Sequence, residues 1–215
     1  MNYGGKLFAS MTIGLILIGM TVMVEAAPSM SGSTGMIRIP TADSLRLGQF
    51  SAGYYSWDNQ SVAVAGVGLP WGLELSAAAP WQSSRSGDWT VNAKFNLNQE
   101  ALLYPAVSVE IEDIDGKNRR SVYGVISKTL PYGFRVHIGT GTGRFEGMFG
   151  GIEKVLNPTP IRRKHVGFPV TSVLVELDGY KMNYGLRFRL AKGLRLDAGW
   201  QGRDEKVYWG ISFTH

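Results

Sequence analysis

The most regular part of the sequence is residues 180–190, which read Tyr180-Lys181-Met182-Asn183-Tyr184-Gly185-Leu186-Arg187-Phe188-Arg189-Leu190. Apolar and polar side chains alternate along this stretch without a break. Because successive side chains of a β-strand point to opposite faces, the alternation predicts a strand with one apolar and one polar face. The same pattern returns in residues 194–201 and 207–214, so the end of the chain is predicted to form three consecutive strands.

Two architectures produce strands of this kind. In a water-soluble β-sandwich the apolar face lies in the core, but the opposite face is rarely so rich in arginine, lysine and asparagine. In an outer-membrane β-barrel the apolar face contacts lipid and the polar face lines the lumen. We favour the barrel, and the remaining sequence tests this interpretation.

Further segments of about ten residues, separated by turn residues, precede these strands, as expected for an outer-membrane barrel. They are residues 49–57, 60–69, 71–79, 89–97, 103–111, 119–129, 134–142, 147–156 and 170–177. With the three strands at the end of the chain they give about 12 strands, an even number as in bacterial barrels. The sequence therefore predicts an all-β fold, an antiparallel up-and-down transmembrane β-barrel formed by residues 49–215.

The first 26 residues have the features of a secretory signal peptide. Lys6 supplies a positive charge, residues 7–24 are almost wholly apolar, and small residues precede a cleavage position after Ala26. An uncleaved membrane anchor is the alternative, because the apolar stretch is long enough to cross a bilayer. With cleavage, the chain is expected to pass the inner membrane and reach the outer membrane.

Residues 27–48 lie between the predicted signal peptide and the first predicted strand. They begin with small residues and contain Pro40, which argues against a central strand because proline has no backbone N–H to donate. We interpret this segment as a lead-in that crosses or plugs one mouth of the barrel.

Composition limits the classes of function. The chain has 215 residues, enough for one domain, and its 28 glycines and many aromatic residues suit strands and turns. It has no cysteine, which excludes disulfides and cysteine-based metal or redox sites. The formal net charge of +5 is spread along the sequence and gives no nucleic-acid footprint. We expect no cofactor.

Charged side chains on the polar faces are expected to line the lumen. Opposite charges crowded into a narrow lumen would pair and seal it, so we expect a cross-braced polar interior rather than an open pore. The candidate lumen-lining residues are Glu74, Lys94, Glu110, Arg135, His137, Glu153, Glu176, Lys181, Arg187, Arg189, Arg195 and Asp197.

An enzymatic barrel needs a nucleophile and a base, and the chain has three histidines that could supply the base. His137 has an inward position on its predicted strand, but no spacing singles out a serine partner. We expect it to form hydrogen bonds in the lumen, and we expect no enzymatic activity. The glycine-rich residues 139–151 lack the Lys-Ser/Thr ending of a phosphate-binding loop.

Two further features concern the ends of the strands. The loop 157–168 is long and basic, and the strand count places it on the periplasmic side, where turns are normally short. Either the count is wrong by one, or this loop has a periplasmic role. Tryptophans near the strand ends suit the aromatic girdles of a barrel, and they are Trp57, Trp71, Trp81, Trp89, Trp200 and Trp209.

Three motifs follow one another along the chain. They are Gly35-Met36-Ile37-Arg38-Ile39-Pro40-Thr41-Ala42 with Leu45-Arg46-Leu47-Gly48, then Phe149-Gly150-Gly151-Ile152-Glu153, then Leu174-Val175-Glu176-Leu177-Asp178-Gly179 with Asn183-Tyr184-Gly185-Leu186-Arg187-Phe188. In this order they resemble the YjbH-like family of bacterial outer-membrane proteins. Leu177 stands where that family is expected to have an aromatic residue, and family members are usually much longer.

The resemblance implies a β-barrel linked to exopolysaccharide production and carries no catalytic residues. The chain is therefore expected to be a non-enzymatic outer-membrane β-barrel that serves the secretion or surface organisation of exopolysaccharide. Its expected partners are outer-membrane lipid and, by resemblance, polysaccharide or export-machinery proteins. A small passive channel or structural barrel is one alternative, and a lipid-modifying barrel enzyme that uses His137 is another.

Overall fold

The structure is a computed structural model that describes residues 26–82, 85–86, 88–163, 166–179 and 181–215. The predicted signal peptide falls almost wholly outside the described residues, as do Lys164, His165 and Tyr180. No helix in the described part of the chain is long and apolar enough to cross a membrane.

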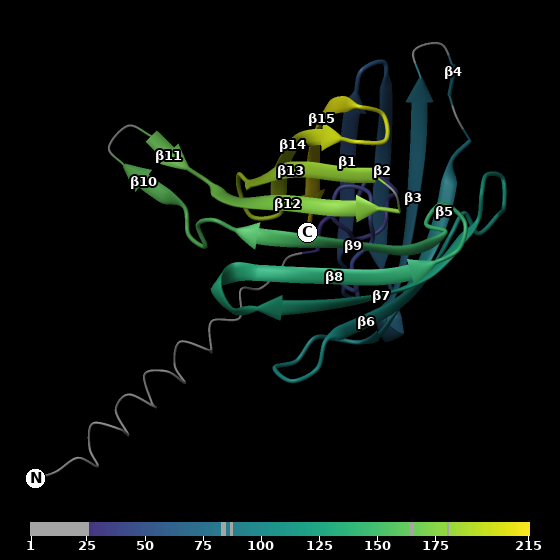
Figure 1. Cartoon of the computed structure of the whole chain (residues 1–215), viewed down its shortest axis with the longest axis horizontal. Coiled ribbons are helices and arrows are strands. Elements are labelled where there is room, and N and C mark those ends of the chain that lie inside the picture. The colour runs from purple at the N-terminus through teal and green to yellow at the C-terminus, as the bar shows by residue number, and fades with distance from the viewer. Residues whose placement is uncertain (1–25, 83–84, 87, 164–165, 180) are drawn as a thin grey trace, which may run out of the picture.

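Twelve antiparallel strands form the closed wall of a barrel in the described part of the chain (Figure 1). Each wall strand pairs with the next along the chain, and β1 pairs with β15 to close the ring. The wall strands are β1 (Phe50–Trp57), β2 (Gln60–Gly68), β3 (Leu73–Gln82), β5 (Thr90–Asn98), β6 (Ala106–Glu112), β7 (Ser121–Leu130), β8 (Phe134–Gly141), β9 (Gly147–Val155), β12 (Val170–Asp178), β13 (Lys181–Arg189), β14 (Leu194–Gln201) and β15 (Lys206–Thr214). The predicted up-and-down barrel of about 12 strands is confirmed.

Side chains alternate between the outside and the inside of this wall as the sequence predicts. Along β15, Val207, Trp209, Ile211 and Phe213 are exposed, whereas Tyr208, Ser212 and Thr214 are buried. The exposed set is apolar and the buried set carries polar atoms, which is the inverse of a soluble protein. This arrangement suits an outer surface that contacts lipid.

The two ends of the barrel differ in what they carry. We call the end at which β1 begins and β15 stops the terminal end, and the opposite end the distal end. Near the terminal end, the backbone N–H of His215 donates to the carbonyl of Phe50 at 3.0 Å. The turns 69–72, 99–105, 131–133 and 190–193 and the loop 156–169 also lie there, because each follows a strand that runs toward that end.

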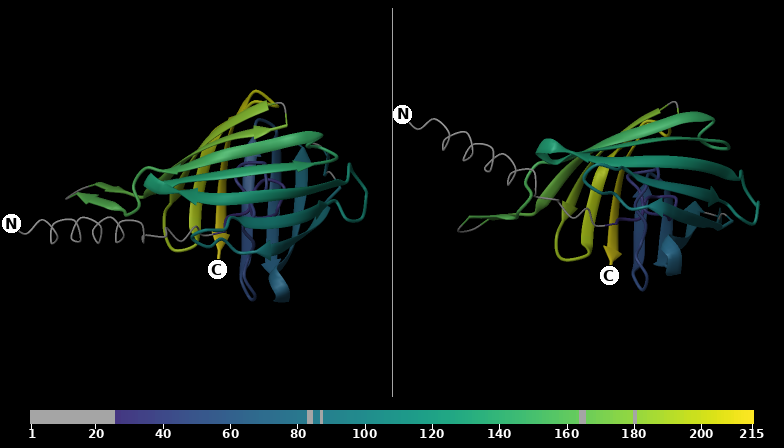
Figure 2. Two further views of the ribbon diagram at one scale, coloured as in Figure 1. Left: turned by 60° about the horizontal axis from the view of Figure 1, so that its bottom comes forward. Right: turned by 90° about the horizontal axis from the view of Figure 1, so that it is seen from below.

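The long loop 156–169 carries a small hairpin of β10 (Ile161–Arg163) and β11 (Val166–Phe168), which extends away from the wall (Figure 2). Because the strand count is correct, a counting error does not explain the length of this loop. On the distal side, the short β4 (Arg85–Ser86) pairs with the last residues of β3.

Two turns at the terminal end share one backbone geometry. The short 3₁₀ turns η1 (Pro70–Gly72) and η2 (Pro131–Gly133) each place an aromatic residue and then a glycine at positive φ. Trp71 has φ 60° and Tyr132 has φ 63°, and both side chains are almost fully exposed. The two turns thus repeat one hairpin geometry. Of the predicted girdle tryptophans, Trp57 is the exception, because it packs against the buried core.

A charge on the outer face tests whether this face contacts lipid. Arginine at Ile211, in the middle of β15, is expected to lower the free energy of unfolding by about 2–4 kcal/mol, because it would lie near the bilayer midplane. Arginine at Val207, near the end of the same strand, should cost about 0–1 kcal/mol. Denaturant titration in lipid vesicles, followed by tryptophan fluorescence, measures both values. Equal costs would contradict a membrane-spanning β15.

Candidate functional site

Residues 26–48 form what we call the inner segment; residues 26–45 occupy the interior of the barrel, and residues 46–48 are exposed just before β1. It folds on itself through short backbone contacts, with bridges between Pro28 and Thr34 and between Gly35 and Pro40. Most of its residues are buried, and Ile39 and Ala42 have no exposed surface. Because the segment forms neither a helix nor a regular strand, many of its backbone groups need partners on the wall.

Glu74 of β3 binds one side of the inner segment. Its carboxylate accepts hydrogen bonds from the backbone N–H of Thr34, the hydroxyl of Thr34 and the backbone N–H of Leu45, each at 2.7 Å. Glu74 is 1% exposed. A buried carboxylate with three donors is well satisfied, so this contact holds two separated points of the segment to the wall.

Glu176 of β12 binds another stretch of the inner segment in the same way. Its carboxylate accepts the backbone N–H groups of Ile37 at 3.0 Å, Arg38 at 2.9 Å and Ile39 at 3.3 Å. The side-chain amide of Asn183 donates a fourth hydrogen bond at 2.8 Å. Three successive N–H groups therefore converge on one carboxylate.

Cationic side chains of the wall bind carbonyl and carboxylate oxygens of the inner segment. Lys94 donates to the carbonyl of Thr34 at 2.5 Å, and its ammonium lies 3.5 Å from Glu110. Arg135 pairs with Asp43 of the segment at 2.8 Å. Through these contacts the two cations hold the segment to the wall, and Glu110 and Asp43 balance their charges.

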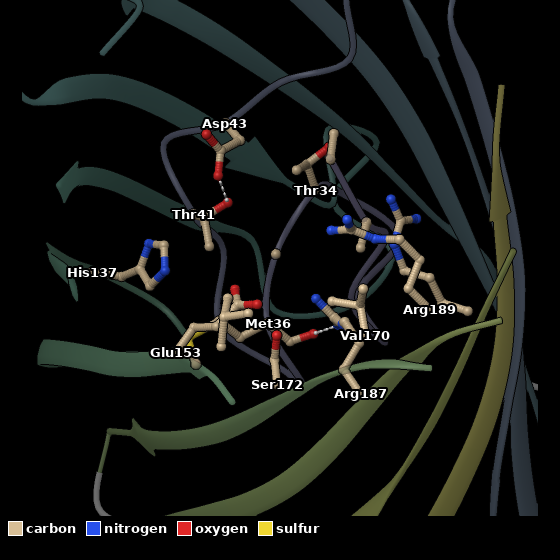
Figure 3. Close-up of a pocket in the computed structure, with 15 residues that line it drawn as sticks. Thr34, Met36, Thr41, Asp43, His137, Glu153, Val170, Ser172, Arg187 and Arg189 are labelled. Carbon is tan, nitrogen blue, oxygen red and sulfur yellow. Dashed lines mark hydrogen bonds between the residues drawn. The ribbon is translucent and has the colours of Figure 1, made fainter. Parts of the chain in front are cut away.

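Arg187 of β13 makes the same double contact. Its guanidinium donates to the carbonyl of Met36 at 3.0 Å (Figure 3). It also pairs with Asp197 at 2.9 Å. The Met36 carbonyl is thereby held beside β13, through a residue 151 positions further along the chain.

Wall glycines provide the space for the apolar side chains of the segment. A β-carbon at Gly151 would lie 2.4 Å from the sulfur of Met36, and one at Gly185 would lie 3.2 Å from a methyl group of Ile37. Such distances leave no room for a side chain at Gly151. The inner segment and the wall are therefore packed against each other like parts of one core.

At the distal end, Arg38 of the inner segment reaches the wall. Its guanidinium pairs with Asp178 at 3.1 Å and donates to Gln201 at 2.8 Å. Arg144, in the loop after β8, donates to the Arg38 carbonyl at 2.8 Å and pairs with Glu112 at 2.6 Å. Burial lowers the pKa of Arg144, but Glu112 and Asp178 raise it by more, so the pKa lies above its usual value.

The candidate lumen residues fall into three groups. Lys181 differs from the expectation, because it is exposed as the first residue of β13, where the strand emerges at the distal end. Glu153 and Arg189 are partly buried. The buried residues are Glu74, Lys94, Glu110, Arg135, His137, Glu176, Arg187, Arg195 and Asp197.

Several wall residues that contact the inner segment were not among the candidates. The Tyr55 hydroxyl donates to the Pro28 carbonyl, Asn92 donates to the Ser31 carbonyl and Asn96 donates to the Ala42 carbonyl. They share the inward positions of the alternating pattern, but they carry no charge, and charge was the signal on which the predicted lumen residues were based.

His137 contacts a serine, but the described residues around it do not form a catalytic triad. Its Nδ1 lies 2.7 Å from the hydroxyl of Ser127, and that hydroxyl accepts the backbone N–H of Ala42 at 2.8 Å. Its Nε2 has no hydrogen-bond partner in the described part of the chain, so no carboxylate orients the ring. Among the described residues, no group of three histidine, aspartate or glutamate side chains could hold a metal ion.

A closed ring of antiparallel strands with an apolar outer face and a polar interior defines an outer-membrane β-barrel. Two similar solved structures are porins. The KdgM porin aligns with a TM-score of 0.53 and 12% sequence identity, over 78% of this chain and 98% of the porin. The KdgM porin in complex with disordered oligogalacturonate aligns with a TM-score of 0.52 and 12% identity, over the same shares of each chain.

A family model assigns the chain more narrowly. The model described as "Exopolysaccharide biosynthesis protein YbjH" matches residues 28–168, and the chain belongs to this family. The matched region includes the inner segment from Pro28 onward and the wall strands as far as β9. The comparison with curated proteins gives no match.

Replacing Glu176 by alanine tests how the inner segment is held. The change is expected to lower the free energy of unfolding by about 3 kcal/mol or more, because three backbone N–H groups and Asn183 lose a charged acceptor. The chain has no cysteine, so Met36→Cys gives a single thiol in the interior. Maleimide should label this thiol slowly in the native background and much faster with Glu176→Ala. Asp88→Ala, at an exposed distal position, is the control.

Equal labelling rates in the Glu176→Ala and control backgrounds would contradict this role of Glu176. A normal shift in gel mobility on boiling, the signature of a folded barrel, must accompany each variant. Faster labelling would then reflect a loosened inner segment rather than an unfolded wall.

Proposed function

We propose that the mature protein is a non-enzymatic outer-membrane barrel that serves the secretion or surface organisation of exopolysaccharide, and that residues 27–48 act as its plug. The signal peptide, residues 1–26, would be cleaved during export. Membership of the exopolysaccharide biosynthesis family supports the process. The attachment of the inner segment to opposite parts of the wall, through Glu74 and Glu176, supports the plug.

The plug proposal follows from how completely the interior is filled. The inner segment contacts strands around the ring, from Tyr55 on β1 through Lys94 on β5 and Arg135 on β8 to Arg187 on β13. A saccharide chain could not share this space with the segment. Transport of a saccharide would therefore require displacement of the segment. With the segment in place, the barrel would be a closed protein of the outer membrane.

We propose partners for the outer face of the barrel and for its two ends. Outer-membrane lipid contacts the apolar outer face, while polysaccharide or export-machinery proteins are proposed as partners at the ends. A porin of similar fold is described in complex with oligogalacturonate, which makes a saccharide a reasonable ligand class for this chain too.

Conductance in planar bilayers distinguishes the plugged barrel from a passive channel. The mature protein is expected to stay near the baseline, whereas a variant without residues 27–48 should conduct as an open pore. A variant without residues 114–117, an exposed distal loop, should remain closed. Each protein must first show the mobility shift of a folded barrel. Open-pore conductance of the intact protein would refute the plug and favour the channel.

Deletion of the gene tests the cellular role. Cells without the protein should release less exopolysaccharide or hold it differently at the surface, and expression of the intact chain should restore the original amount and distribution. Measurement of cell-bound and released polysaccharide, with mass spectrometry of the lipids in parallel, separates the alternatives. Unchanged polysaccharide with an altered lipid profile would instead favour a lipid-modifying enzyme.

A further inference from the structure

The two ends of the barrel differ in the charge of their turns and loops. At the distal end, these segments contain six basic and seven acidic residues, so their charges nearly balance. At the terminal end, the same kind of segment contains only one acid in the sequence, Glu100. The basic residues there are Arg46, Arg162, Arg163, Lys164 and Lys192. The terminal end is therefore markedly positive.

Glu100 is not available to balance these basic residues. Its carboxylate lies 3.4 Å from the ammonium of Lys128 and 3.2 Å from the guanidinium of Arg135. It also accepts the backbone N–H of Thr129 at 2.7 Å. Arg46 and Lys192 are exposed, and neither forms an ion pair within the described part of the chain. The terminal end thus presents unpaired positive charge to its surroundings.

The hairpin of β10 and β11 contributes the largest share of the basic residues. Arg162 and Arg163 belong to β10, and the hairpin extends away from the wall (Figure 2). At its base, Ile161 and Phe168 lie directly opposite each other, and about half of each side chain is exposed. The combination of basic residues with exposed apolar side chains is typical of segments that lie in a membrane interface.

Hydrogen bonds fix the base of this hairpin. The side-chain amide of Asn157 donates to the carbonyl of Pro169 at 2.8 Å, and its oxygen accepts the backbone N–H of Thr171 at 3.0 Å. The N–H of Leu156 donates to the carbonyl of Thr171 at 2.8 Å. The hairpin is therefore joined to β9 and β12 in a defined way, which lowers the entropy cost of placing it on a surface.

The rim of the terminal end also carries the most exposed large apolar side chains of the described residues. Each is at least 70% exposed, and they are Leu47, Trp71, Leu102, Leu103 and Tyr132. Tryptophan and tyrosine are enriched at the headgroup level of a bilayer, and basic residues are attracted to anionic headgroups. A soluble polyanion would match the charge but would leave these apolar side chains in water. The combination favours a lipid leaflet.

We propose that the terminal end, with the β10–β11 hairpin, binds the phosphate headgroups of anionic phospholipids in the adjoining leaflet. Ile161 and Phe168 would face the acyl chains, and the basic residues of the hairpin would lie among the phosphates. This role explains why the loop 156–169 is long at an end where turns are normally short. It depends neither on the plug nor on a role in polysaccharide handling.

A single dye on the hairpin tests the proposal. Gly167→Cys is suitable because a β-carbon at Gly167 would have no heavy atom within 4 Å, and the native chain has no cysteine. The mature barrel, labelled there with the environment-sensitive dye NBD, is placed in phosphatidylcholine vesicles with or without phosphatidylglycerol. Phosphatidylglycerol should shift the emission to the blue and increase quenching by nitroxide-labelled lipid. Salt at about 1 M should reverse both effects, because it shortens the screening length to about 3 Å.

Variants of the labelled protein locate the interaction. Arg162→Gln with Arg163→Gln should weaken association with the anionic surface about 25-fold, since each basic residue near such a surface contributes about fivefold. Lys117→Gln with Arg119→Gln removes the same number of charges from an exposed distal loop and should leave the signal unchanged. Phe168→Ser should reduce quenching by nitroxide-labelled lipid. Boiling-dependent gel mobility checks that each variant folds.

Three results would overturn the proposal. One is equal emission and quenching with and without phosphatidylglycerol, and another is an unchanged signal in the Arg162→Gln, Arg163→Gln variant. The third is that soluble polyglucuronate shields the dye from iodide whereas anionic vesicles do not, which would assign the hairpin to a polymer in water. None of these results decides the proposed function, because conductance and gene deletion test it separately.

Discussion

The structure depends on one requirement, that the backbone of the inner segment find hydrogen-bond partners inside the barrel. The segment is too irregular to satisfy itself, and a buried N–H without an acceptor costs about 1–3 kcal/mol. Glu74 and Glu176 answer this requirement by accepting several N–H groups each. Because both carboxylates are fixed on wall strands, the position of the segment and the closure of the wall depend on each other.

The charges of the interior follow from the same requirement. Glu74 and Glu176 accept N–H groups of the segment, so its carbonyl oxygens need hydrogen-bond donors. Lys94 and Arg187 donate to two of these oxygens. Each cation also contacts an acid of the wall, Glu110 or Asp197. The result is a neutralised interior that is filled by protein, in contrast to the water-filled lumen of an open pore.

The local alternation of apolar and polar residues was enough to predict the wall strands. It was not enough to predict which residues of the inner segment the wall binds. Alternation along residues 180–190 identifies a strand and its two faces because strand periodicity is a local property. It also assigns Lys181 to the inward face, but it does not reveal that Lys181 is exposed at the start of β13, at the distal end. The contacts of Glu74 with Thr34 and of Glu176 with Ile37 span 40 and 139 residues. They exist only after the ring has closed in one register, and no local signal carries that information.

A recess of about 30 Å³ lies between the inner segment and the wall, and its place determines which state of the barrel a ligand there would favour. Its lining is shared between wall residues such as Arg189 and segment residues such as Gly35 and Met36. The recess therefore exists only while the inner segment is in place. A ligand stabilises the state that binds it, by an amount set by its differential affinity. A ligand in this recess would accordingly hold the segment inside the barrel, and release of the segment would require loss of that ligand.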